Sequence, residues 1–82
     1  MANYTEDQVL DARGLLCPMP VVKAAKVMRG MEEGEILKIL ASDRGAIADF
    51  PAWADDTGNE LLESGEEDDG SLVFYIKKGE ED

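Results

Sequence analysis

The sequence has no histidine and a single cysteine, Cys17, among its 82 residues. One cysteine excludes an internal disulfide, and a chain without histidine cannot form the usual Cys/His zinc sites, Cys-His dyads or Ser-His-Asp triads. No apolar run approaches the roughly 20 residues of a membrane-spanning helix, and the first seven residues are polar and acidic, unlike a signal segment. We therefore expect a cytoplasmic protein with a free thiol, no metal and no membrane contact.

Basic residues are also scarce, because 8 Lys and Arg stand against 19 Asp and Glu, for a net charge of −11. Residues 1–40 carry six acids and five bases, whereas residues 41–82 carry thirteen acids and three bases. Such acidity opposes direct nucleic-acid binding, which depends on neutralising phosphates, and favours attraction to basic protein partners. The length predicts one small domain over residues 1–82, with flexible ends at 1–7 and 79–82.

The segment Cys17-Pro18-Met19-Pro20 comes directly before an apolar-periodic stretch. Proline is tolerated in the first turn of a helix, so this segment predicts a helix from Pro18 to about Arg29, with Cys17 at or just before its cap. The helix dipole and the unpaired N–H groups there would lower the pKa of the thiol. We expect Cys17 to be an exposed nucleophile; the alternative is that it is a small buried apolar residue, as free cysteines often are.

Hydrophobic periodicity predicts the element order βαβαββ. Strands are expected at residues 8–12, 35–41, 60–64 and 71–77, with a hairpin turn at 66–70. The order predicts an α+β two-layer sandwich, in which two helices pack on one face of a four-stranded mixed sheet.

The second helix is expected within residues 46–57 and contains Pro51. Because proline is disfavoured deep in a helix, its regular part should begin near Asp49, with Ile47 and Phe50 on the buried face. Ser42, Asp43 and Asp49 are the candidates for its N-terminal cap.

Several residues near Cys17 are candidates for a supporting role. Gly14 should adopt a φ that other residues avoid, and Pro18 and Pro20 should stiffen the chain around the thiol. Arg13 either lies beside Cys17 and stabilises its thiolate or is a solvated loop residue. Met19, between the prolines, is expected to be exposed as an apolar contact beside the sulfur.

Basic residues recur at every third position along the first helix, at Lys23, Lys26 and Arg29. This stripe either docks an acidic partner protein or is a solvated helix face. Lys23 and Lys26, together with Met19, are therefore candidates for partner binding.

Residues 10–20, with the sequence LDARGLLCPMP, resemble the signature of the TusA/SirA-like sulfur carriers, whose hallmark is Cys-Pro-X-Pro. Segments 34–37, 49–54 and 58–61 and Asp43 resemble the same family, so that the resemblance covers about residues 8–79. It implies a fold like the C-terminal domain of bacterial translation initiation factor three, in which only the last strand runs antiparallel. The sequence departs from many members at Arg44-Gly45 and at Asn59, which leaves the subfamily open.

The resemblance also implies that Cys17 accepts a sulfane sulfur as a persulfide and passes it on, with no cofactor. Its partners would be a rhodanese-like protein or cysteine desulfurase as donor and a protein as acceptor, in tRNA thiolation, molybdenum-cofactor synthesis or sulfur oxidation. The absence of an acid/base dyad fits a carrier better than a self-sufficient enzyme. Two alternatives remain, an acidic regulatory adaptor in which Cys17 is incidental and a redox sensor in which Cys17 forms a mixed disulfide.

Overall fold

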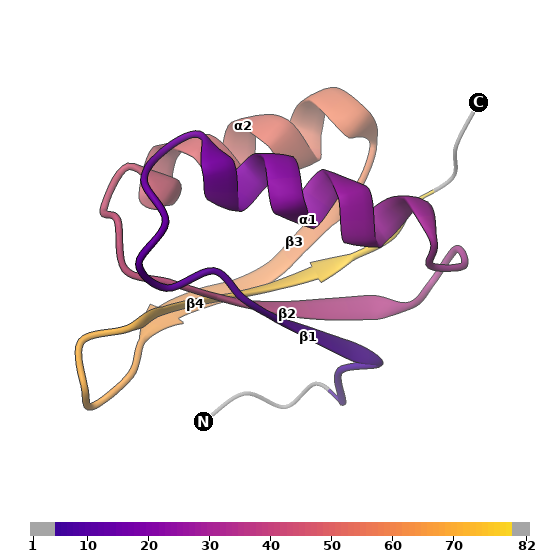
Figure 1. Ribbon diagram of the computed structural model, residues 1–82. Helices are drawn as coiled ribbons and strands as arrows, with labels where there is room; N and C mark the ends of the chain where they lie inside the picture. The colour runs from indigo at the N-terminus through magenta and orange to yellow at the C-terminus, as the bar shows by residue number, and fades with distance from the viewer. Residues whose placement is uncertain (1–4, 80–82) are drawn as a thin grey trace.

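The computed structural model describes residues 5–79, and residues 1–4 and 80–82 lie outside the described part. Its elements, in chain order, are β1 (Gln8–Asp11), α1 (Met19–Arg29), β2 (Ile36–Ala41), α2 (Ala46–Thr57), β3 (Glu60–Glu66) and β4 (Leu72–Lys77). The predicted order βαβαββ is confirmed. Both helices lie on the same face of the sheet, which makes the expected two-layer sandwich (Figure 1).

The four strands are arranged in the order β1-β2-β4-β3. β1 pairs in parallel with β2, and β4 pairs antiparallel with both β2 and β3, so only the last strand runs opposite to the others. The parallel pair requires a crossover, and α1 supplies it. Because β1 and β2 are parallel neighbours, the loops that follow them leave the sheet at the same edge, and this edge carries Cys17.

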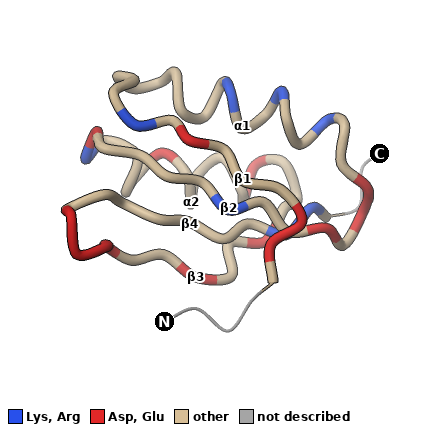
Figure 2. Tube along the Cα trace, turned by 60° about the horizontal axis from the view of Figure 1, so that its bottom comes forward, with Lys and Arg blue, Asp and Glu red and all other residues tan. Residues whose placement is uncertain are grey.

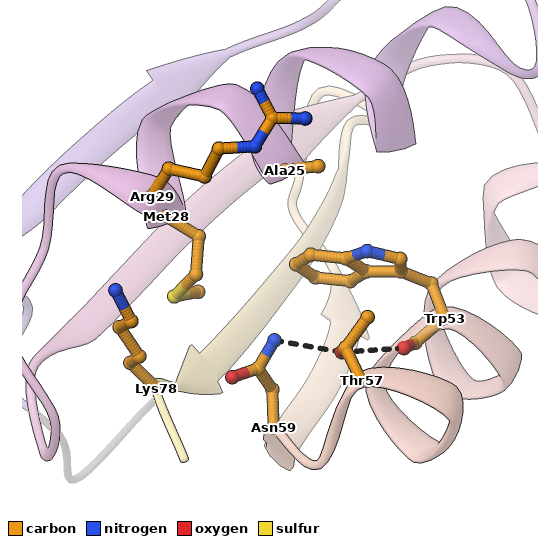
Figure 3. Close-up of a pocket in the computed structure, with 7 residues that line it drawn as sticks. All are labelled: Ala25, Met28, Arg29, Trp53, Thr57, Asn59 and Lys78. Carbon is orange, nitrogen blue, oxygen red and sulfur yellow. Dashed lines mark hydrogen bonds between the residues drawn. The ribbon is translucent and has the colours of Figure 1, made fainter. Parts of the chain in front are cut away.

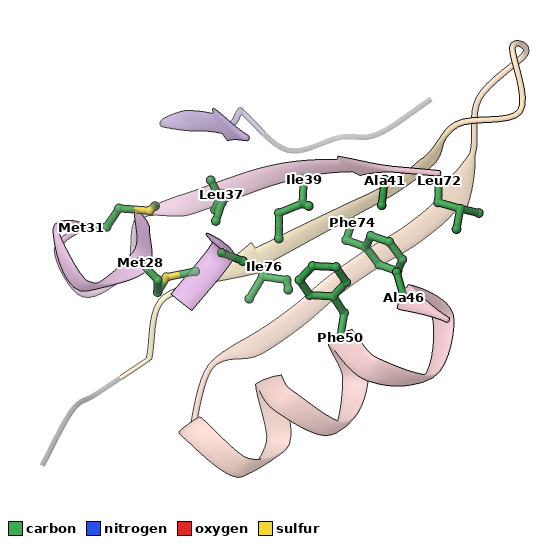
Figure 4. Packing of buried hydrophobic residues seen from close by; sticks show 11 residues of the cluster. Met28, Met31, Leu37, Ile39, Ala41, Ala46, Phe50, Leu72, Phe74 and Ile76 are labelled. Atoms are coloured by element: carbon green, nitrogen blue, oxygen red, sulfur yellow. The ribbon is translucent and has the colours of Figure 1, made fainter. Parts of the chain in front are cut away.

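The core lies between the helices and the sheet (Figure 4). β4 sends Leu72, Phe74 and Ile76 into it, as the alternation of the strand predicts. Phe50 of α2 is fully buried, and the centroid of its ring lies 4.8 Å from the centroid of the Phe74 ring. Burying one such side chain contributes about 1.5–3 kcal/mol, so this contact anchors α2 to the sheet.

The predicted start of α2 was wrong. The helix begins at Ala46 rather than near Asp49, so Pro51 lies inside it, where the carbonyl of Ile47 receives no N–H from the proline. Ala46 and Phe50 are four residues apart and both buried against the sheet, so tertiary packing outweighs this loss. With Ala46 and Phe50 facing the sheet, Ile47 is 46% exposed, contrary to the expectation that it would face the core.

The ends of the described chain are tied to the sheet. Asp7 N–H donates to the carbonyl of Ile36, and Gly79 N–H donates to Asn59 Oδ1 at 2.9 Å. Of the ends expected to be flexible, residues 1–4 and 80–82 lie outside the described part. Neither helix within residues 5–79 has the length and apolar character to cross a membrane.

Candidate functional site

The loop before α1 is fastened to the loop after β2 by backbone hydrogen bonds. Gly14 N–H donates to Ser42 Oγ at 2.8 Å, and Cys17 N–H donates to Asp43 Oδ2 at 2.6 Å. Gly14 has a φ of +86°, so the prediction of an unusual backbone angle there is confirmed. These contacts place Cys17 beside the first residues of α2, although it precedes α1 in the chain.

Ser42 and Asp43 do not cap α2 as expected. No side chain makes a capping hydrogen bond at Gly45, the residue before the helix. Asp43 instead accepts from the backbone of both Cys17 and Gly45, and these two bonds lower the pKa of its carboxyl. Asp43 is therefore an anion that joins the two loops, and it remains charged close to the thiol.

Cys17 is exposed, as predicted, and lies just before Pro18, the N-terminal cap of α1. The peptide bond between these two residues is cis. Pro18 is exposed, whereas Pro20, in the first turn of α1, is buried, so the two prolines differ in their surroundings. Gly45 faces Cys17 from the other loop, where an added Cβ would lie 3.2 Å from Cys17 Cβ and 3.5 Å from Sγ.

The Cys17 thiol donates a hydrogen bond to Asp49 Oδ2, in the first turn of α2. This bond raises the pKa of Cys17; desolvation and the charges of Asp49 and Asp43 act in the same direction. The expectation of a lowered pKa was therefore wrong. The helix dipole supplies only partial charges, whereas Asp49 supplies a full negative charge in direct contact with the sulfur.

A hollow of about 320 Å³ opens beside the thiol. Its lining comes from the start of α1 and from one side of α2: Cys17, Pro18, Val21, Asp49, Ala52, Trp53 and Asp56. The apolar part and the two carboxylates thus share one surface with the sulfur, and the lining includes no basic side chain.

Arg13 binds carboxylates at the near edge of the sheet. Its guanidinium donates to both oxygens of Asp11, with Nε at 2.9 Å from Oδ1 and Nη2 at 2.8 Å from Oδ2, and it lies 3.6 Å from Asp69. The hydrogen bonds from the side chain and backbone of Arg13 lower the pKa of the Asp11 carboxyl to about 2. The guanidinium therefore binds these two carboxylates rather than stabilising a Cys17 thiolate.

The candidates for partner binding lie on the surface. Met19 is 42% exposed, so its predicted exposure is confirmed, while its contact role stays a prediction. Lys23, Lys26 and Arg29 are exposed along α1 and form a basic stripe (Figure 2). Within residues 5–79 none of the three forms an ion pair.

A second hollow, of about 330 Å³, lies between α1 and α2 nearer their C-terminal ends (Figure 3). Asn59 Nδ2 donates to Thr57 Oγ1, which in turn donates to the carbonyl of Trp53 at 2.7 Å. Trp53 lines this hollow and the one beside Cys17, and its half-buried indole therefore lies between them. Across residues 5–79 no group of three or more Cys, Asp or Glu side chains is placed to bind a metal ion.

Sequence reasoning treated Asp49 only as a cap. It did not identify five further residues around the thiol as part of the site: Val21, Gly45, Ala52, Trp53 and Asp56. One signal was available, because loops that follow parallel neighbouring strands meet at one sheet edge. That argument brings residues 42–45 near Cys17. It does not reach Asp49, whose side chain is directed by the packing of α2.

The sequence and the fold have counterparts among known proteins. The family model for sulfurtransferase TusA matches residues 8–78. The chain belongs to the TusA family. It is 50% identical over 78 residues to the sulfur carrier protein TusA of Allochromatium vinosum, covering 95% of this chain and 99% of that protein.

Some relatives are longer. The chain is 47% identical over 81 residues to a longer Aquifex aeolicus protein, of which it covers 41%. The crystal structure of a SirA-like protein from Desulfitobacterium hafniense superposes with a TM-score of 0.77 at 28% identity, over 89% of this chain and 99% of that one. The predicted resemblance to the TusA/SirA-like family is confirmed.

Proposed function

We propose that this protein is a cytoplasmic sulfur carrier that holds a sulfane sulfur on Cys17 as a persulfide. The observation that carries the proposal is one exposed thiol, presented at the edge of a hollow by two fastened loops, in a chain of the TusA family. A carrier requires a cysteine sulfur that its partners can reach. Relatives that bear the name sulfur carrier support this role.

The reaction is an exchange in which no net oxidation occurs. The Cys17 thiolate attacks the terminal sulfur of a donor persulfide, the donor S–S bond breaks, and the donor cysteine leaves as a thiolate. Cys17 then carries the terminal sulfur, and an acceptor thiolate removes it by the same step in reverse. The donor would be a rhodanese-like protein or a cysteine desulfurase, and the acceptor a protein of tRNA thiolation, molybdenum-cofactor synthesis or sulfur oxidation.

The neighbours of Cys17 have positioning roles in this proposal. Gly14 gives the loop before α1 its positive φ, and Gly45 permits the close approach of the loop after β2 to Cys17. Pro18 and Pro20 stiffen the chain at the sulfur. Met19, Lys23 and Lys26, which are exposed on α1, would contact the donor or acceptor. Arg13 fastens the loop end to Asp11 rather than acting on the thiol.

The test is to incubate the protein with a cysteine desulfurase and free cysteine, then measure intact mass before and after a reductant. A carrier gains one sulfur atom that the reductant removes, and Cys17→Ser gains none. Failure of the wild type to gain sulfur from either this donor or a thiosulfate-loaded rhodanese would overturn the proposal. Gain of glutathione or a disulfide dimer instead would indicate a redox sensor, and no change at all would indicate an adaptor.

A further inference from the structure

The site contains an obstacle to its own proposed chemistry. Sulfur exchange needs a thiolate, whereas Cys17 donates its proton toward Asp49 and has a raised pKa. The other charged groups facing the thiol are Asp43, from the loop after β2, and Asp56, which lines the same hollow from α2. All three are acids, and within residues 5–79 no basic side chain lines the hollow beside the sulfur to favour the thiolate.

The hollow beside the thiol has the chemistry of a site for a long basic side chain. Val21, Ala52 and Trp53 provide an apolar wall, which suits the methylene stem of arginine or lysine. The half-buried indole of Trp53 also offers a face to a cation, and Asp49 and Asp56 supply opposite charge. An acidic or purely apolar occupant would leave these carboxylates desolvated and unpaired.

We propose that this hollow receives an arginine or lysine side chain of the protein that gives or takes the sulfur, and that this side chain pairs with Asp49. The inference rests on the proposed function, since it assigns the partner of the same site. Pairing draws Asp49 away from the thiol, the thiol proton passes to solvent, and the thiolate that remains attacks the partner sulfur. Cys17 thus reacts faster where a basic side chain accompanies the reacting sulfur.

The basic stripe on α1 makes this a two-part recognition surface. Lys23 and Lys26 favour an acidic region on the partner, whereas the hollow favours one basic side chain next to its reactive cysteine. A partner with the opposite arrangement of charges would be repelled at both places.

The proposal is tested with small disulfides, so that no sulfur donor is needed. Cystamine carries two ammonium groups, and bis(2-hydroxyethyl) disulfide is a neutral compound of similar size. Cys17 attacks either one, forms a mixed disulfide and releases the other half as a thiolate, which intact mass follows over time. The cystamine preference is the ratio of the two rates, divided by the same ratio for N-acetylcysteinamide to remove intrinsic reactivity.

We expect the wild type to show a cystamine preference of about tenfold at low salt. Asp56→Asn should lower this preference about threefold, because one local charge is lost. Asp55→Asn is the matched control: it removes the same charge from the adjacent exposed residue of α2, outside the hollow, and should leave the preference unchanged. Asp49→Asn should lower the preference and accelerate the reaction with the neutral disulfide.

Two results would overturn the inference. One is a cystamine preference of one or less for the wild type, which means that Cys17 favours cystamine no more than N-acetylcysteinamide does. The other is an equal loss in Asp55→Asn and Asp56→Asn, which would reduce the preference to net charge. Repeating the rates at about 0.5 M salt supports the hollow if the difference between the variants persists, since long-range attraction is then screened. Sulfur loading by a desulfurase is measured separately, so failure of the carrier proposal is distinguishable from failure of this one.

Discussion

The two helices lie on the same face of the sheet but carry opposite charge (Figures 1 and 2). α1 has no acid in its first turn and has Lys26 and Arg29 in its last, whereas α2 has Asp49 in its first turn and no base in its last. Asp49 interacts favourably with the positive end of the α2 dipole, and Lys26 and Arg29 interact favourably with the negative end of the α1 dipole. Packing on the same face of the sheet therefore does not fix the charge that a helix carries.

Cys17 lies where the two helices meet, and the difference between them decides its state. By sequence it belongs to the start of α1, but its sulfur contacts the first turn of α2. The charge of the neighbouring helix overrides the dipole of its own, because a carboxylate in contact outweighs partial charges. The comparison teaches that a thiol at a helix start is not thereby a thiolate.

The largest expected effect concerns how firmly α2 is anchored to the sheet. Phe50→Ala should lower the free energy of unfolding by about 3–5 kcal/mol, because it removes a fully buried ring that packs on Phe74. Ile47→Ala, on the exposed side of the same helix, should change it by less than about 0.5 kcal/mol. Urea unfolding of both variants checks this, and equal losses would contradict the placement of the core.

A smaller effect is expected at Gly45, which faces Cys17 from the loop before α2. Gly45→Ala places a Cβ 3.2 Å from Cys17 Cβ and should cost about 1 kcal/mol while pushing the thiol from Asp49. Its alkylation by iodoacetamide should then be faster than in the wild type. Gly30→Ala is the control on α1, since the nearest heavy atom lies at 3.7 Å and no strain is expected. An unchanged alkylation rate in Gly45→Ala would argue against the close approach.

The basic stripe of α1 should matter for partner encounter. Lys26→Glu should slow sulfur uptake from a cysteine desulfurase about threefold at low salt, with less effect at high salt. Lys77→Glu makes the same change in charge on an exposed residue of β4 and should have little effect. Equal slowing in the two variants would mean that overall charge, not the α1 surface, governs the encounter.

The last prediction concerns proton affinity alone. Asp49→Asn should lower the pKa of Cys17, because it removes the hydrogen bond and charge that raise it. The reactive thiolate would then form at lower pH, so the midpoint of the alkylation rate against pH should move down. Asp55→Asn should leave the midpoint in place. An unmoved midpoint in Asp49→Asn would show that the thiol is not bound to that carboxylate.

Local patterns were sufficient to predict most of the fold. Strand alternation and helix periodicity place β1, α1, β2 and β4 within a few residues, because these patterns record which side chains face the core. The start of α2 was wrong because the cost of Pro51 was weighed without the packing of Ala46 and Phe50 on the sheet.

The site was predictable in part. Arg13 binds Asp11, which is only two residues away in the sequence, rather than the Cys17 thiol. Such a local pair could have been predicted from the sequence. The hollow is made by side chains from both helices, including Val21 and Trp53, and no local pattern reports where two helix surfaces meet. Helix crossing is decided by how side chains interlock over the whole interface.

The sequence by itself determined the order of the elements, the exposed cysteine at the start of α1 and the family to which the chain belongs, since each depends on neighbouring residues. Only the tertiary structure decided which charge the thiol meets. Asp49 is 32 residues from Cys17 along the chain, and it reaches the sulfur because α2 is packed on the sheet with Phe50 inward. A pKa depends on atoms in contact, and those contacts exist only after folding.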